Sequence, residues 1–194
     1  IQKMKIQKGE AGYLRAKKKK TAVLTALAFL VVAAIVAAGW MMYHTRLNVF
    51  TVVAGLICLP ACRLLVALIM LLPHQSIDEA TELEISGHTE DLTMLYDLVV
   101  TSERRAMPIE ALAISGNTVC GYVRSKKVDT AYAARHIKSI LKQNKLEKIT
   151  VKLFHDYVAF LSRAEGMNSI AAVEQRPAKK QEEKIKEIIL NISL

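Results

Sequence analysis

The chain has 194 residues, of which 52% are hydrophobic, and it carries a formal net charge of +9 at pH 7. Residues 1–74 contain ten Lys/Arg and one acid, which accounts for the whole excess, whereas residues 75–194 contain 17 Lys/Arg and 17 Asp/Glu. The mean hydropathy of +0.23 is high for a soluble domain. The positive charge therefore belongs to the apolar part of the chain and does not indicate a nucleic-acid-binding domain.

A basic arm, residues 1–20, precedes the first long apolar run. Its basic residues nearest to that run are Arg15, Lys17, Lys18, Lys19 and Lys20. Basic residues in this position mark the cytoplasmic side of a membrane helix. An anionic leaflet would attract them by about 1 kcal/mol per basic residue. We expect the arm to contact anionic lipids.

Two apolar runs follow, residues 21–42 without any charge and residues 49–72 with a single charge. As helices they would be about 33 and 36 Å long, enough to cross a bilayer core of about 30 Å. The first run is longer than the roughly 7–15 apolar residues of a cleavable signal peptide, so we expect an uncleaved anchor. Only residues 43–48 separate the runs. The sequence predicts a tight membrane hairpin with both termini in the cytoplasm.

Arg63 is the one charge inside the second run. It lies nine residues before Leu72, about 14 Å of helix, and so near the bilayer midplane, where an arginine costs about 2.5–3.5 kcal/mol. It could extend to the cytoplasmic interface, or bond to backbone carbonyls that Pro60 leaves free. It could instead meet an acid of a partner or an anionic headgroup, since neither run contains an acid.

Small residues in the two runs predict close packing of the hairpin. They are Ala33, Ala34, Ala37, Ala38, Gly39, Ala54, Gly55 and Ala61. Cys58 and Cys62 share one helix face without a further thiol or histidine nearby, which is too few ligands for zinc. We expect contacts with a protein partner, or with a second copy of the chain, through this hairpin.

After a linker, residues 73–78, the remaining residues 79–194 suffice for one domain with its own core. Apolar periodicity, turn residues and capping residues predict its elements. These are a helix from Thr89 to about Arg104, a hairpin of strands 109–115 and 118–124 around Gly116-Asn117, a helix over 129–144, a strand over 149–154, a helix that Asp156 caps and Gly166 ends, and a last helix after Pro177.

The predicted order is thus α-β-β-α-β-α-α, an α+β domain with a mixed sheet of three to four strands. The helix over 129–144 should return the third strand parallel to a hairpin strand by a right-handed crossover. Its inner side is predicted to be Ala134, Ile137 and Leu141, and its outer side Arg135, Lys138 and Lys142. The outer side is expected to face solvent; the alternative is a basic patch that includes Lys145 and Lys148.

The order hairpin–helix–strand resembles the core of the restriction-endonuclease-like nucleases. The resemblance implies an Asp near the first hairpin strand and an Asp/Glu-x-Lys motif on the second, which together hold magnesium. Residues 118–124 read TVCGYVR and contain no carboxylate, and Glu110 alone cannot hold the ion. The resemblance therefore implies a degenerate site.

Nearly the whole chain also resembles a family of small two-helix membrane proteins of Gram-positive gut bacteria. The stretches that carry the resemblance are GEAGY (9–13), TVVAG (51–55), LPACR (59–63), HIKSILK (136–142) and LNISL (190–194). Some members are labelled O-linked N-acetylglucosamine transferase-like. We do not expect that activity, because 116 residues cannot contain the helical repeats and the sugar-nucleotide domain of such an enzyme.

Together these features predict a two-pass bacterial protein of the cytoplasmic membrane, with a cytoplasmic interaction or scaffold module at its C-terminus. We expect no catalytic activity, cofactor or metal, and no nucleic-acid partner. The alternative is a metal-dependent, nuclease-like hydrolase tethered to the membrane.

Overall fold

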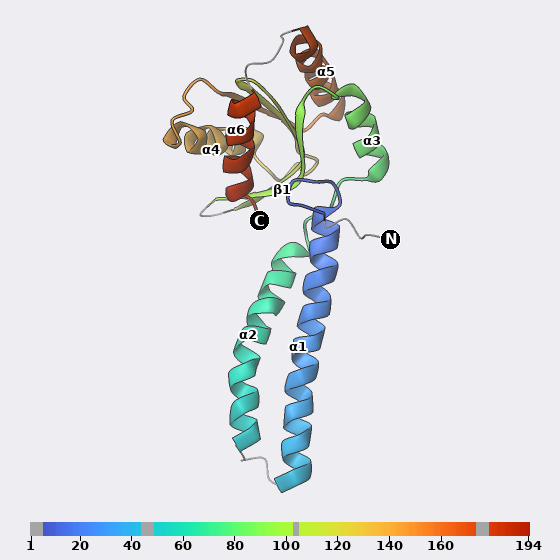
Figure 1. The fold of residues 1–194 in the computed structure, drawn as a ribbon, viewed down its shortest axis with the longest axis vertical. Coiled ribbons are helices and arrows are strands. Elements are labelled where there is room, and N and C mark those ends of the chain that lie inside the picture. The colour runs from blue at the N-terminus through green and yellow to red at the C-terminus, as the bar shows by residue number, and fades with distance from the viewer. Residues whose placement is uncertain (1–5, 44–48, 103–104, 174–178) are drawn as a thin grey trace. The chain divides into compact units, whose positions relative to one another are not determined.

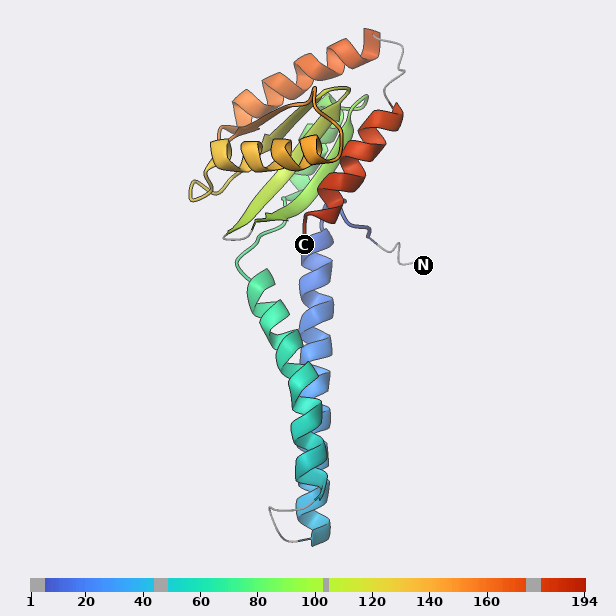
Figure 2. The same cartoon turned by 90° about the vertical axis from the view of Figure 1, so that its left-hand side faces the viewer.

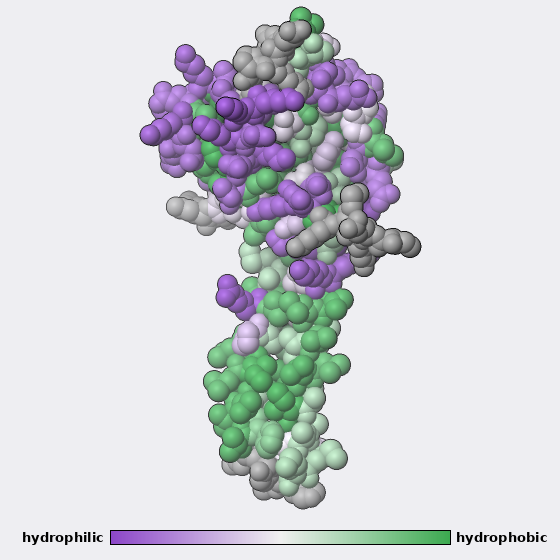
Figure 3. Space-filling model, in the orientation of Figure 1, coloured by the Kyte–Doolittle hydropathy of each residue, from purple (hydrophilic) through white to green (hydrophobic). Residues whose placement is uncertain are grey.

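The computed structural model describes residues 6–43, 49–102, 105–173 and 179–194. The chain divides into two compact units: residues 14–75 form a helical hairpin, and the residues before and after it together form an α/β unit. Figure 1 shows both as ribbons. Figure 3 shows a mostly hydrophobic surface on the hairpin and a mostly hydrophilic one on the α/β unit.

The hairpin consists of α1 (Tyr13–Tyr43) and α2 (Val49–Leu71). Both helices are long and apolar enough to cross a membrane. Helix α1 contains the whole of the predicted run 21–42, and α2 continues through Pro60. The predicted turn over 44–48 lies outside the described residues.

The two helices are least exposed along one seam. Its residues recur every three or four positions: Thr25, Ala28, Val32, Ile35 and Gly39 on α1, and Ala54, Ile57, Ala61, Leu64, Leu68 and Leu71 on α2. This spacing of 3.5 residues is typical of coiled-coil packing. The Thr25 hydroxyl donates to the Thr21 carbonyl, 2.8 Å away, so the polar group in the seam is satisfied.

The prediction that the small residues pack between the two helices is partly wrong. Gly39, Ala54 and Ala61 are buried in the hairpin, but the other five, Ala33, Ala34, Ala37, Ala38 and Gly55, are exposed. They fall between seam positions, and the periodicity of the helix rather than residue size decides which of them faces the other helix.

The α/β unit contains a four-stranded mixed sheet in the order β1-β2-β3-β4. Its strands are β1 (Thr93–Thr101), β2 (Ala106–Ser115), β3 (Thr118–Tyr122) and β4 (Thr150–Phe154). The first three are antiparallel neighbours, and β4 runs parallel to β3. The predicted hairpin at Gly116-Asn117 and the parallel third strand are confirmed; Gly116 has a φ of 52°, as the tight turn requires.

Helices cover both faces of this sheet, as Figures 1 and 2 show. One core contains Ile85 and Phe160, from α3 (Glu79–His88) and α5 (Tyr157–Val173). The other contains Ile137 and Ile185, from α4 (Thr130–Gln143) and α6 (Lys179–Asn191). The order in this unit is therefore α-β-β-β-α-β-α-α. It differs from the predicted order because α3, which was not predicted, precedes β1, and because residues 93–101 form a strand.

The helix predicted over 89–104 is wrong. Thr89 instead ends α3, where its hydroxyl donates to the Ile85 carbonyl at 2.7 Å, and residues 93–101 form β1. All residues from Leu95 to Val100 are buried, because helices lie on both faces of the sheet. A strand buried on both faces shows no alternation of apolar and polar residues, so its apolar run can be mistaken for a helical stripe.

Two details of the predicted helices also change. Helix α5 continues through Gly166 to Val173, since Gly166 has an ordinary helical backbone. On α4 the buried residue of the first turn is Ala133 rather than Ala134. The predicted cap of α4 is confirmed: the Asp129 carboxylate accepts from the backbone N–H groups of Ala131 and Tyr132.

The outer edge of β1 is covered by both ends of the chain. The Tyr96 N–H donates to the Gly9 carbonyl at 2.8 Å, and the Leu194 N–H donates to the Val99 carbonyl at 2.9 Å. The Lys8 ammonium also donates to the Ser193 carbonyl. These contacts satisfy backbone groups that an edge strand would otherwise present to other chains.

Gly9 lets the N-terminal segment approach β1 closely, and replacing Gly9 should weaken the contact between the two. Gly9 has a φ of 92°, and a Cβ atom there would lie 2.8 Å from a Leu95 methyl and 3.0 Å from a Leu190 methyl. Gly9→Ala combines backbone strain of about 1 kcal/mol with a steric clash of about 1–3 kcal/mol. We expect a lower unfolding temperature of the full chain in detergent and faster hydrogen exchange at the Tyr96 amide.

Gly12→Ala is the matched control. Gly12 has a φ of 79°, but the nearest atom to its added Cβ would be 4.0 Å away. This variant should therefore show the backbone strain without the clash. Equal losses of stability in the two variants would contradict the close packing of Gly9 against β1.

Candidate functional site

Two buried carboxylates lie opposite each other in the sheet. Asp97 on β1 and Glu110 on β2 fall between the registered pairs Tyr96–Ala111 and Leu98–Ile109. They are only 2% and 7% exposed. Asp97 has a φ of 54°, in the left-handed region that Asp tolerates better than most residues.

Both carboxylates are bonded to the chain's own backbone. Asp97 accepts from the Ile77 N–H at 2.8 Å and from the Ser76 hydroxyl. Glu110 accepts from the Arg124 N–H at 2.9 Å. Burial raises the pKa of Glu110, and the charge of Asp97 raises it further, against the lowering effect of the Arg124 N–H.

The structure thus places a second carboxylate beside Glu110. The sequence did not indicate this pair, because the apolar run around Asp97 was predicted as a helix. Two carboxylates are a minimal set for a divalent ion. Across the described residues, however, no group of three or more His, Cys, Asp and Glu side chains is placed to hold a metal. The arrangement of these two acids suits the fixing of backbone segments.

Three tyrosines lie on the face of the sheet that α3 and α5 cover: Tyr96, Tyr122 and Tyr157. The Tyr157 hydroxyl donates to Glu84 at 2.8 Å, and its ring meets Tyr122 edge-on with centroids 5.4 Å apart. The buried Tyr96 hydroxyl has no hydrogen-bond partner among the described residues. Burial raises the pKa of Tyr96 to about 12, and the charge of Glu82 adds to this effect. The Tyr96 ring is part of the buried core, and the partly buried rings of Tyr122 and Tyr157 pack against it.

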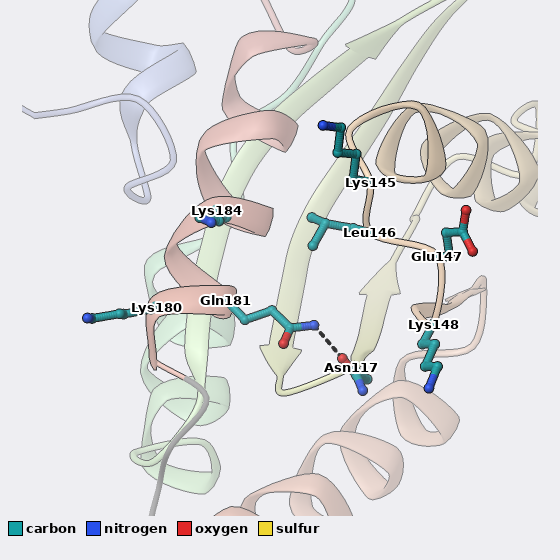
Figure 4. A pocket seen from close by; sticks show the side chains of 8 residues that line it. All are labelled: Asn117, Lys145, Leu146, Glu147, Lys148, Lys180, Gln181 and Lys184. Carbon is teal, nitrogen blue, oxygen red and sulfur yellow. Dashed lines mark hydrogen bonds between the residues drawn. The ribbon is translucent and has the colours of Figure 1, made fainter.

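A groove of about 640 Å³ opens between α6 and the connection from α4 to β4, next to the β2–β3 turn. Figure 4 shows the residues that line it. They are Asn117, Lys145, Leu146, Glu147, Lys148, Lys180, Gln181 and Lys184. The volume lies within the roughly 300–1,000 Å³ that is usual for small-molecule sites.

One wall of this lysine groove is set by the end of α4. The Leu146 N–H donates to the Leu141 carbonyl and the Lys145 N–H to the Lys142 carbonyl, each at 3.0 Å. This is a Schellman motif, in which glycine usually occupies the left-handed position. Here Lys145 occupies it, with a φ of 65°. The motif directs Leu146 back onto the core and leaves Lys145 exposed.

The other wall is fixed by the first turns of α6. Buried Glu182 accepts from the Gly116 N–H at 2.8 Å and from the Thr93 hydroxyl at 2.9 Å. The neighbouring Gln181 amide donates to the Asn117 side chain at 2.5 Å. These bonds hold α6 against the β2–β3 turn, which lies beside the groove.

The predicted basic face does not coincide with the lysine groove. Arg135, Lys138 and Lys142 are exposed on α4 and do not line it; the Arg135 guanidinium donates to the Ala131 carbonyl of its own helix. Lys145 and Lys148, which belong to the alternative basic patch predicted from the sequence, do line the groove. Lys180 and Lys184 were missed, although their spacing of four residues places them on one side of a helix.

In the hairpin, Arg63 is exposed and lies outside the seam. The basic residues of the arm, Arg15, Lys17, Lys18, Lys19 and Lys20, form the first turns of α1. The Lys18 ammonium donates to the Leu72 carbonyl at 2.9 Å, which caps the C-terminal end of α2. Burial lowers the pKa of nearby His74, and the charge of Lys18 lowers it further.

Glu110→Gln should change how stability depends on pH. The pKa of Glu110 is higher in the folded chain than its ordinary value of 4.5, so its contribution is fully present below that value and is lost as pH rises through the folded pKa. Glutamine keeps the acceptor for the Arg124 N–H but cannot ionise. In the pH window between the ordinary and the folded pKa of Glu110, the free energy of unfolding of the variant should rise relative to wild type by about 1.4 kcal/mol per pH unit.

The free energy of unfolding of the full chain in detergent, measured against pH, tests this expectation. Glu187→Gln removes one acid from the exposed side of α6 and serves as control. Stability curves of Glu110→Gln and wild type that stay parallel through the window would contradict the assigned environment of Glu110.

The described part of the α/β unit therefore contains two groups of polar side chains with distinct chemistry. The buried carboxylates bind backbone segments, whereas the lysines around the groove face solvent. No family model, curated protein or solved structure matches this chain.

Proposed function

We propose that the protein is a two-pass, membrane-anchored module whose α/β domain lies in the cytoplasm and works by binding, without a catalytic step. The observation that supports this proposal best is that three buried acids of the α/β unit hold its own backbone. Asp97, Glu110 and Glu182 accept from the backbone N–H groups of Ile77, Arg124 and Gly116. Oxygens engaged in this way stabilise the fold and are poorly available to a metal or a substrate.

The hairpin's surface supports the membrane anchor. Large apolar side chains such as Leu30, Val52 and Leu59 are 66–70% exposed. Soluble monomers rarely expose contiguous apolar patches beyond a few hundred Å², and a bilayer would cover this surface. Trp40, 62% exposed near the end of α1, suits the far interface, where tryptophan is enriched.

The charges at the other end support the orientation. Arg15 and Lys17–Lys20 lie on the first turns of α1, and Lys18 bonds to the end of α2. The positive-inside rule puts this end in the cytoplasm. Two crossings then return the chain to the same side, which places the α/β domain there.

Cysteine labelling of intact cells tests this topology. In a background with Cys58, Cys62 and Cys120 replaced by alanine, a membrane-impermeant maleimide should label Arg46→Cys. Lys138→Cys, on the exposed side of α4, should be labelled only after the membrane is permeabilised. The reverse pattern would overturn the orientation, and labelling of both positions in intact cells would overturn the two-pass anchor.

Arg63 supports a contact within the membrane. It lies outside the seam, and neither apolar run contains an acid, so the hairpin supplies no counter-charge. A charge held near the midplane costs a few kcal/mol unless it is paired. We infer that an acid of a membrane partner or an anionic headgroup meets it.

Substitutions of Arg63 separate this contact from simple tolerance of the charge. Arg63→Leu should insert at least as well as wild type, because the cost of the central charge disappears, yet lose the proteins that co-purify in mild detergent. Arg63→Lys should retain part of them, since it keeps the charge without the planar guanidinium. Identical co-purification of all three forms would mean that Arg63 only extends to the interface.

The alternative, a nuclease-like hydrolase, has one observation in its favour: Asp97 lies opposite Glu110 in the sheet. An ion that binds only the folded chain at 100 times its dissociation constant would stabilise it by about 2.7 kcal/mol. A rise of this size with magnesium or manganese, together with nucleic-acid cleavage that Glu110→Ala abolishes, would favour the hydrolase over the binding module.

A further inference from the structure

We propose that the lysine groove binds a compact polyphosphate, a group that carries two or more adjacent phosphates. This goes beyond the anchored module proposed above, because it assigns a ligand class to one surface of the α/β domain. The groove is formed by two segments that lie about 35 residues apart in the sequence, the α4–β4 connection and the first turns of α6.

The first argument is the charge of the groove. Four of its eight lining residues are lysines and one is an acid, Glu147. None of these lysines forms an ion pair within the described part of the chain. Residues 75–194 carry equal numbers of basic and acidic residues, so the excess positive charge in the groove is local. A concave surface focuses such a field and attracts anions.

The second argument is the kind of donor. Lysine ammonium groups act as compact point charges with three donors each, which suits phosphate oxygens. The groove is lined by no aromatic residue and no arginine, so it offers no surface on which a nucleic-acid base could stack. It also contains a single apolar side chain, Leu146, which is too little for the anchor residues of a peptide.

The third argument is the rigidity of the walls. Figure 4 shows Lys145 and Leu146 facing α6 from the connection, with Lys184 and Gln181 on the opposite wall. The Schellman bonds fix the first wall, and Glu182 fixes the second. A lysine in the left-handed conformation at position 145 is less stable there than glycine would be, which fits a site that needs its ammonium group.

Two sources could supply this chemistry, a free polyphosphate or the phosphorylated headgroup of a lipid. The first binding experiment therefore titrates inorganic triphosphate into the full chain in uncharged detergent. The second uses lipid nanodiscs with and without a bisphosphorylated inositol lipid, with the protein inserted and a fluorescent triphosphate as the displaced probe. If the fluorescent triphosphate is displaced only in nanodiscs that contain the inositol lipid, the lipid headgroup is the source.

The variants are Lys145→Gln combined with Lys184→Gln, one from each wall. We expect binding of triphosphate to weaken by about tenfold or more for each lysine removed. Binding should also fall between about 0.01 and 1 M salt, where the Debye length falls from about 30 to about 3 Å. Glu147→Gln should tighten binding, because it removes a repulsive charge; poor folding cannot produce that gain.

The matched control combines Lys138→Gln on α4, which precedes the connection, with Lys186→Gln on α6, and removes the same charge outside the groove. An equal loss in control and groove variants would overturn the site and leave only general attraction to a basic protein. No saturable binding of triphosphate, or stronger binding of a polyglutamate peptide at equal charge, would also overturn the proposal.

Discussion

Two neighbouring residues of the edge strand β1 hold the segments through which the chain leaves and re-enters the α/β unit. The Tyr96 N–H bonds to Gly9, in the segment before the hairpin, and the Asp97 carboxylate bonds to Ile77, in the segment after it. Asp97 has a left-handed backbone at this place, and Gly9 has no room for a side chain. The fold of the α/β unit thus depends on residues from both sides of the hairpin.

The other buried acids of the α/β unit, Glu110 and Glu182, also bind segments that are distant in the sequence. A buried carboxyl group is stable only when its oxygens have hydrogen-bond partners, and here the donors are backbone N–H groups and the hydroxyls of Ser76 and Thr93. Glu182 joins α6 to the β2–β3 turn, and Glu110 holds the chain just after β3. Hydrogen bonds to buried acids thereby join elements that are distant in the sequence.

Local signals in the sequence predicted the local parts of this fold. Gly116-Asn117 identified the β2–β3 turn and Asp129 the start of α4, because each residue acts on its own backbone within a few positions. Residues 93–101 were misread because helices cover both of their faces, which no local pattern records. Lys180 and Lys184 could not be joined to Lys145 and Lys148, since only the packing of α6 brings them together. The contact of Gly9 with β1 could not be predicted either, because the whole hairpin separates Gly9 from Tyr96 in the sequence.

The pairing of Gly9 with Tyr96 has a consequence for how the protein is made. The first of these residues leaves the ribosome before either apolar helix, and the second only after both. A chain that crossed the bilayer once would leave the two residues in different compartments, and its sheet edge would stay open. Under the proposed two-pass topology, completion of that edge requires that both helices cross the bilayer, because only then do Gly9 and Tyr96 return to the same side.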